Sequence, residues 1–152
     1  MSDTYWEGNA MTMTAAQRRA WQKRWPNFAP TELASWGGEL RINERALDGL
    51  QAVRTELGKP MHVNSAYRSE AHNRHVGGAP RSQHKAGTAF DIALRGGNDL
   101  RKQAYGDRIE ALARKHGAKG IGRYNSFIHI DWRSGSRVRT WDQRSEALFV
   151  GG

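Results

Sequence analysis

Cysteine is absent from this chain of 152 residues. The protein therefore forms no disulfide bond and offers no thiolate to a metal ion. Any metal site has to be built from the six histidines and the 15 aspartates and glutamates. This limits the search for metal ligands before any fold is considered.

Long runs of apolar residues are also missing. The segment from Met1 to Trp21 contains no apolar stretch that would act as the core of a signal peptide. Nowhere does the chain have the roughly 18 consecutive apolar residues that a membrane-spanning helix needs. We therefore expect a protein that is made in the cytoplasm without a signal peptide and has no transmembrane segment.

Acidic residues are few compared with basic ones. The chain has 15 Asp and Glu against 24 Lys and Arg, a net charge of +9. Such a charge favours a polyanionic partner, and nucleic acid, an anionic membrane face and an acidic cell wall all qualify. The basic residues are scattered, however, and the aromatic residues do not alternate with them in a base-stacking pattern. We therefore expect no nucleic acid partner.

The composition otherwise predicts one folded domain. Hydrophobic residues make up 38% of the sequence and charged residues 26%, as in ordinary globular proteins. The length suits a single hydrophobic core. Residues 1–13 are polar and lack periodicity, so we expect them to form a flexible lead before a single domain over residues 14–152.

Helical periodicity and capping residues predict three main helices. The first begins after Thr14, which is placed to form a capping box with Gln17. The second begins after Asn43, and the third covers about residues 99–116. A further short helix is expected over residues 69–75.

Alternation of apolar and polar residues predicts three strands, over residues 61–67, 89–94 and 126–132. The glycine-rich segment 120–124 is expected to form a turn. This order of elements predicts an α+β fold in which a small, mainly antiparallel sheet is flanked by helices.

The last predicted strand brings an imidazole and a carboxylate to one face, because His129 and Asp131 point away from the neighbouring isoleucines. Asp91 lies on the polar face of the strand before it, and His84 lies in the loop that leads to that strand. Two histidines and one aspartate leave a fourth coordination position for water, as a hydrolytic zinc site requires. On spacing alone, a polar loop followed by a partly exposed strand explains the same residues.

Zinc-dependent hydrolysis also needs a group that moves protons. Zinc lowers the pKa of its water to about 7 and polarises the carbonyl under attack. A nearby carboxylate takes the proton from that water and passes it to the leaving amine. Asp131 is the best-placed candidate. The alternative is that Asp131 orients a ligand histidine, or pairs with Arg68 or Arg133.

A set of separated motifs carries a family resemblance. They are VNSAYRS at residues 63–69, then Asn73, Gly77-Gly78, Ser82-Gln83-His84, Gly87, Ala89 and Asp91, and finally FIHIDWR at residues 127–133. In this order they resemble peptidase family M15, and its M15A-like members in particular. That zinc family includes D-alanyl-D-alanine carboxypeptidases and phage endolysins, and its fold is shared with the hedgehog signalling domain. The resemblance covers about residues 28–133.

The resemblance implies roles for five residues. His84, Asp91 and His129 match the ligands of one zinc ion. Arg68 matches an arginine that stabilises the oxyanion or binds a substrate carboxylate, and its planar fork of donors suits both tasks. Ser82 matches a serine that contacts the substrate. For Arg68, a structural ion pair is the alternative.

One position departs from the family pattern. Many members carry an acidic residue three positions before the last zinc ligand, where this chain has Ser126. A subgroup with His-x-Asp on the final strand resembles this chain more, so Asp131 inherits the acid–base role from that subgroup.

These observations lead to an expected function. We expect a zinc metallopeptidase that hydrolyses a peptide bond in the stem or cross-link peptides of bacterial peptidoglycan, as a carboxypeptidase or an endopeptidase. The resemblance implies a phage or prophage endolysin, or a virion-associated wall hydrolase with phage tail or other virion proteins as partners. Such a protein acts at the bacterial cell wall, after release or as part of a virion.

Two alternatives keep the same fold but give it another role. One is a catalytically inactive module that binds the cell wall, which Ser126 favours. The other is a structural tail subunit of a virion.

Overall fold

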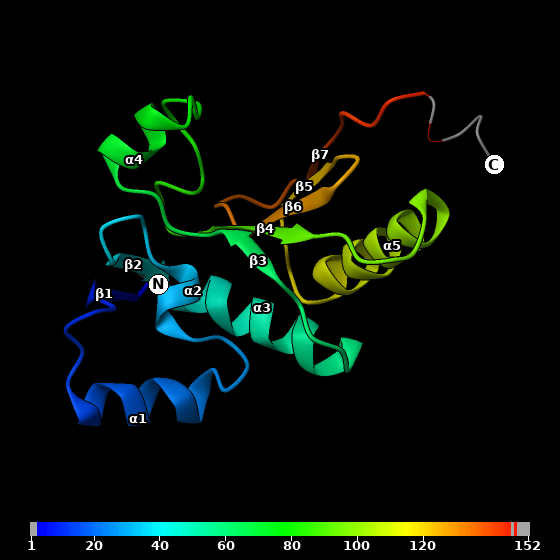
Figure 1. The fold of residues 1–152 in the computed structure, drawn as a ribbon. Coiled ribbons are helices and arrows are strands. Elements are labelled where there is room, and N and C mark those ends of the chain that lie inside the picture. Colours follow the sequence, from blue (N-terminus) through cyan, green and yellow to red (C-terminus); the bar gives the residue numbers. More distant parts are fainter. Residues whose placement is uncertain (1–2, 147, 149–152) are drawn as a thin grey trace.

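Two sheets organise the computed structural model of the chain, which describes residues 3–146 and residue 148 (Figure 1). Their strands are β1 (Tyr5–Asn9), β2 (Glu39–Asn43), β3 (Val63–Ser65), β4 (Ala89–Ala93), β5 (Gly120–Arg123), β6 (Phe127–Asp131) and β7 (Arg139–Asp142). The larger sheet has the order β3-β4-β6-β5-β7, and the smaller one pairs β1 with β2. All pairings are antiparallel except that of β5 with β7. The predicted α+β fold with a small, mainly antiparallel sheet flanked by helices is confirmed.

Capping residues define where the helices begin. The helices are α1 (Ala15–Arg24), α2 (Pro30–Leu33), α3 (Glu44–Leu57), α4 (Glu70–His75) and α5 (Asp99–Lys115). The predicted capping box is confirmed, because the Thr14 hydroxyl accepts from the backbone N–H of Gln17 and the Gln17 side chain accepts from that of Thr14. Asn43 likewise accepts from the N–H of Ala46 at the start of α3. Each cap satisfies an N–H that has no partner inside its helix.

The hydrophobic core lies between the larger sheet and helices α3 and α5, which share one side of it (Figure 1). From the strands, Phe90 and Ile92 of β4 and Ile128 and Ile130 of β6 are fully buried. The helical side chains in this core are equally buried: Leu47, Leu50 and Val53 of α3, with Ile109 and Leu112 of α5. Because side chains alternate along a strand, the residues between these apolar ones point to the other face of the sheet.

The N-terminal segment differs from the irregular lead that the sequence predicts for residues 1–13. Tyr5–Asn9 forms β1, in which Trp6 lies opposite Ile42 of β2. The Trp6 ring also packs edge-on against Trp21 of α1, with 5.4 Å between ring centroids. This strand depends on a partner far along the chain, which local periodicity does not reveal. Met1 and Ser2 lie outside the described residues.

The segment after α5 also differs from its prediction. Gly120–Arg123 is not a turn but strand β5, between β6 and β7. Its glycines lower the strand propensity, which explains the wrong prediction. Gly122 leaves space that the indole of Trp141 fills, because a Cβ there would collide with that ring. Residues 147 and 149–152 of the predicted domain lie outside the described part of the chain.

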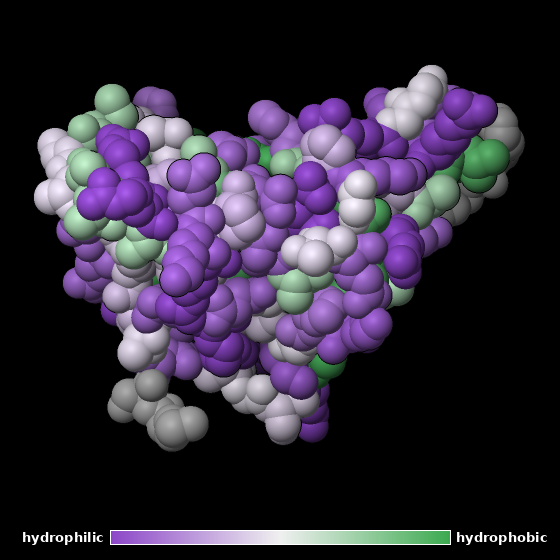
Figure 2. Space-filling view, turned by 90° about the horizontal axis from the view of Figure 1, so that it is seen from below, coloured by the Kyte–Doolittle hydropathy of each residue, from purple (hydrophilic) through white to green (hydrophobic). Residues whose placement is uncertain are grey.

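The surface contrasts with this core. On the face shown in Figure 2, hydrophilic residues predominate and hydrophobic residues form small, scattered groups. Within the described residues, none of the helices combines the length and the apolar character needed to cross a membrane.

Candidate metal centre

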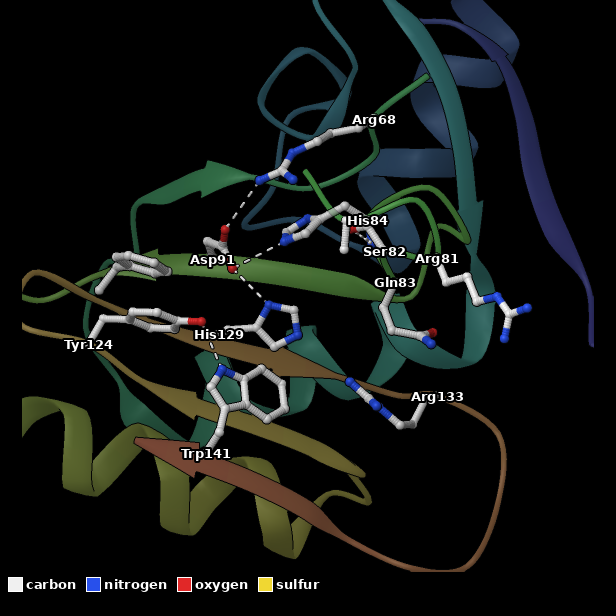
Figure 3. Close-up of a pocket in the computed structure, with 12 residues that line it drawn as sticks. Arg68, Arg81, Ser82, Gln83, His84, Asp91, Tyr124, His129, Arg133 and Trp141 are labelled. Carbon is white, nitrogen blue, oxygen red and sulfur yellow. Dashed lines mark hydrogen bonds and ion pairs between the residues drawn. The ribbon is translucent and has the colours of Figure 1, made fainter. Parts of the chain in front are cut away.

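Three side chains from separate parts of the chain converge on the face of the larger sheet that points away from the core (Figure 3). Nε2 of His84 lies 3.2 Å from Oδ1 of Asp91, and Nδ1 of His129 lies 3.0 Å from the same oxygen. One potential ligand atom from each residue lies within 4.8 Å of the others, and all three residues are buried. In the part of the chain that the structure describes, this is the single such group of His, Asp and Glu.

The strand register places two of the three residues. Asp91 of β4 and His129 of β6 are direct partners in the antiparallel pair. Residues directly opposite in such a pair have Cβ atoms about 4.5–5.5 Å apart. Because their apolar neighbours face the core, both side chains are directed to the same opposite face.

A glycine-containing loop places the third residue. The carbonyl of His84 accepts a hydrogen bond from the backbone N–H of Arg68, at 3.1 Å. Gly87 has a left-handed φ of 73°, and a Cβ there would collide with the carbonyl oxygen of Arg41. The Gly87 carbonyl accepts from the N–H of Asn43 at 2.9 Å. The close approach that only glycine permits therefore fixes the His84 loop against the end of β2.

Hydrogen bonds fix which ring nitrogen of each histidine is free. Nδ1 of His84 lies 2.7 Å from the carbonyl oxygen of Ala66, which only accepts, so Nδ1 carries the proton. Nε2 of His129 lies 2.7 Å from Oδ2 of Asp131 and donates to that carboxylate. With these nitrogens protonated, Nε2 of His84 and Nδ1 of His129 each direct a lone pair toward Asp91 when the imidazoles are neutral.

This donor set suits a metal ion such as zinc. Two imidazole nitrogens and one carboxylate oxygen are zinc ligands of the ordinary kind, and three protein ligands leave a position for water or substrate. Ligating histidines usually donate their second N–H to a carbonyl or carboxylate, as His84 and His129 do. The residues present therefore fit the group that they would hold.

Charges at the centre favour a cation. Burial alone would raise the pKa of Asp91, but the hydrogen bonds and charges that His129 and His84 supply in their protonated forms hold that pKa well below its usual range. Asp131 behaves in the same way, with hydrogen bonds from Arg133 and His129 outweighing burial, so its pKa is also well below normal. Burial lowers the pKa of His129, but its bonds to Asp131 and Asp91 more than compensate and raise it. Both carboxylates are thus ionised at neutral pH.

Asp131 does not reach the space in front of the ligands. Its side chain is fully buried and accepts from Nε2 of His129 and from the backbone N–H, Nε and Nη2 of Arg133. It is not among the residues that line the adjacent cavity. This geometry corresponds to the alternative interpretation from the sequence, in which Asp131 orients a ligand histidine and pairs with Arg133.

A cavity of about 370 Å³ opens beside the three ligand candidates, which is within the range of small-ligand sites. Arg68 lines it, with Nη2 at 3.6 Å from Oδ2 of Asp91. The guanidinium is held from behind, because Nε donates to Ser65 and Nη1 to Asn73. Ser82 also lines the cavity, and its hydroxyl accepts from the His84 N–H at 3.1 Å. The structure thus places Arg68 and Ser82, the two further site residues expected from the family resemblance, beside the three candidate ligands.

The sequence did not reveal the opposite wall. Aromatic side chains from β5, β6 and β7 and their adjoining loops line it: Tyr124, Phe127 and Trp141. Two further polar residues, Arg81 and Gln83, complete the rim on the His84 side. The sequence signal for Trp141 was Gly122, whose lack of a side chain makes room for the indole. That relation between Gly122 and Trp141 becomes visible only when β5 and β7 are recognised as paired strands.

Comparison with known protein families identifies the family of the chain. The sequence model of the family described as Peptidase M15 matches residues 13–131, which includes His84, Asp91 and His129. The match begins upstream of the segment in which the motifs were recognised. No curated protein matches the chain.

Proposed function

The chain belongs to the peptidase M15 family, and on this premise we propose that it is a zinc metallopeptidase that hydrolyses a peptide bond of bacterial peptidoglycan. The observation that carries the proposal is the convergence of His84, Asp91 and His129 beside a cavity. Membership of the family implies peptidase activity. The identities of the metal as zinc and of the substrate as peptidoglycan are what the proposal adds to family membership.

The residues around the centre suit peptide hydrolysis. When bound, zinc activates a water molecule for attack near neutral pH and polarises the peptide carbonyl. Arg68 offers permanently charged N–H donors to the oxygen that gains negative charge, or to a substrate carboxylate. Ser82 lines the same cavity, within reach of a peptide that binds there. Asp131 keeps His129 in the tautomer that leaves Nδ1 free for the metal.

The charge of the cavity supports an anionic substrate. Three guanidinium groups line it, those of Arg68, Arg81 and Arg133, whereas Asp91 is the single carboxylate among the described lining residues. Stem and cross-link peptides of peptidoglycan carry free carboxylates, which such a cavity attracts. The net charge of +9 favours attachment to an anionic wall.

We further propose that the protein acts at the bacterial cell wall, as a phage or prophage endolysin or as a wall hydrolase carried by a virion. The support is the motif resemblance to wall-cleaving M15 peptidases together with the net charge of +9. As a virion component, it would have tail or other virion proteins as partners.

One observation favours a second candidate, a wall-binding or tail module without turnover. Ser126 stands where many family members have an acidic residue, and no carboxylate other than Asp91 lines the described part of the cavity. In this case the metal site would persist but no bond would be cut.

One digestion experiment separates the two. Purified peptidoglycan is incubated with zinc-loaded protein and with chelator-treated protein, and the fragments are identified by mass spectrometry. New peptide ends that require zinc would support the peptidase and would name the bond. An intact wall, with stoichiometric zinc confirmed in the protein, would support the binding module.

A further inference from the structure

The hydroxyl of Tyr124 is held at the cavity by a tryptophan from the last strand. Nε1 of Trp141 lies 2.7 Å from the hydroxyl oxygen of Tyr124 (Figure 3). The Trp141 ring also lies 5.1 Å from the ring of His129, between centroids. Tyr124 is stacked on Phe127, with 4.1 Å between centroids and 9° between planes. The stacked ring of Phe127 and the hydrogen bond from Trp141 therefore fix the position of this hydroxyl.

The direction of that hydrogen bond determines what Tyr124 offers. An indole N–H only donates, so the Tyr124 oxygen must be the acceptor. The hydroxyl proton of Tyr124 is then left for another acceptor. Tyr124 lines the cavity beside His129, so that proton is available to a group bound there.

Packing alone does not account for Trp141. It is only partly buried, and it does not belong to the hydrophobic core or to the partly buried side chains that pack on it. Its ring covers Gly122, and beyond that backbone contact it meets two side chains, the ring of His129 and the guanidinium of Arg133, whose Cζ lies 5.6 Å from the ring centroid. Both neighbours line the cavity. Trp141 lies outside the segment matched by the family model, which ends at residue 131.

We propose that Tyr124 is a catalytic residue, which donates a hydrogen bond to the carbonyl oxygen of the scissile peptide as that oxygen gains negative charge. Trp141 is its positioning residue, and β7 is therefore part of the active site. The hydroxyl keeps its own proton throughout, so the step requires no further reactant. The inference rests on the proposed peptidase function and deepens it, because it assigns a neutral donor on the wall opposite Arg68.

Tyr124→Phe tests the donor, because it removes one oxygen and keeps the ring on Phe127. Loss of one such donor lowers kcat by about 10²–10³-fold in other enzymes, and we expect a decrease of at least about tenfold with little change in KM. Tyr105→Phe is the matched control, since the Tyr105 hydroxyl bonds the Pro60 carbonyl and does not line the cavity. Both variants should retain stoichiometric zinc.

Trp141→Phe tests the positioning role, because it keeps an aromatic ring and removes the N–H. Alone it should lower kcat by less than Tyr124→Phe does. In the double variant it should add no further loss, because its effect passes through the hydroxyl. Losses that multiply in the double variant would overturn this role.

A binding measurement separates this inference from the function on which it rests. The probe is a phosphinate peptide, whose tetrahedral, anionic group replaces the scissile amide and resembles the transition state. Tyr124→Phe should weaken phosphinate binding to the zinc-loaded protein by about the factor lost in kcat, and should leave the affinity for the product peptide unchanged. Equal phosphinate affinity in wild type and variant would overturn the inference, whether or not the protein turns over. Failure of the wild type to bind phosphinate or to cleave wall peptides would contradict the proposed function as well.

Discussion

Oδ2 of Asp131 lies 2.7 Å from Nε2 of His129, and the Asp131 side chain is fully buried. This hydrogen bond keeps the imidazole proton on Nε2 and leaves Nδ1 free to bind a metal. Arg133 forms two side-chain hydrogen bonds to the same carboxylate and holds it in place. The chain therefore has a row of contacts, from Arg133 through Asp131 to His129, that ends at the candidate metal centre.

Asp131→Asn should weaken zinc binding while it spares turnover. Loss of such an orienting partner typically costs about 10–100-fold in metal affinity. We expect a loss of that size in a competitive chelator titration, and a nearly normal kcat at saturating zinc. Asp142→Asn is the control for loss of an Asp–Arg pair, because the Asp142 carboxylate also accepts two side-chain hydrogen bonds from an arginine, Arg144, and does not line the cavity. A loss of kcat of about a hundredfold at saturating zinc, with normal affinity, would instead favour the acid–base role predicted from the sequence.

His84→Ala and His129→Ala should each remove the metal. Each deletes one of three ligands, and the two that remain cannot complete a protein site of this kind. Zinc measured by plasma mass spectrometry after dialysis should fall from one per chain to trace amounts, and wall hydrolysis should be lost with it. His75→Ala is the control, because His75 is exposed on α4 and should keep the zinc. Stoichiometric zinc in both ligand variants would refute the assignment.

Capping chemistry and short-range periodicity predicted the core elements of the fold. The starts of two helices could be predicted from Thr14 and Asn43, because a capping side chain bonds a backbone N–H within three residues of its own position. The alternation around Asp91 and His129 placed both on the polar face, as observed. Strands β1, β2, β5 and β7 were missed because their pairing is distant in sequence or is masked by glycine, so local patterns carry little trace of them.

The candidate site was predictable only in part, for a related reason. The family resemblance pointed to His84, Asp91, His129, Arg68 and Ser82, and the structure brings all five together. The resemblance could not show that Asp131 lies behind His129, since a period of two gives the face of a residue but not its burial. The position of Trp141 at the site could not be predicted from the sequence, because it depends on the parallel pairing of β7 with β5.

Arg68→Lys should lower kcat and keep zinc. Lysine preserves the charge but not the fork of donors, which here is held by Ser65 and Asn73. If Arg68 stabilises developing charge, kcat should fall by about 10²-fold. Arg74→Lys, on the exposed side of α4, should leave the rate unchanged. If Arg68 instead binds a substrate carboxylate, the variant will differ from wild type mainly by a higher KM. That difference will disappear with a substrate whose carboxylate is amidated.

Gly87→Ala should damage both the fold and the metal centre. A Cβ at this position collides with the Arg41 carbonyl, and its φ of 73° is unfavourable for alanine. Gly77 has a similar φ of 71°, but a Cβ there would meet only open space, so Gly77→Ala should cost only about 1–2 kcal/mol of conformational strain. Denaturant unfolding should show a larger loss for Gly87→Ala, and this variant alone should lose affinity for zinc. Equal losses of unfolding free energy in Gly87→Ala and Gly77→Ala would mean that the close approach of Gly87 to the Arg41 carbonyl does not matter for stability.

His72 should titrate below the usual histidine range. Burial and then the charge of Arg68 lower its pKa from the ordinary 6.5. The geometry agrees, because Nδ1 accepts from the backbone N–H of Trp36 at 3.3 Å, and a protonated Nδ1 cannot accept. The fold therefore favours neutral His72, whose contribution to the free energy of unfolding is complete above pH 6.5 and is lost as the pH falls through the lowered pKa. An NMR titration, assigned with His72→Gln, should give a midpoint below 6.5. The free energy of unfolding should decrease more between about pH 7 and pH 5 in the wild type than in His72→Gln, and a midpoint at or above the ordinary value would contradict this account.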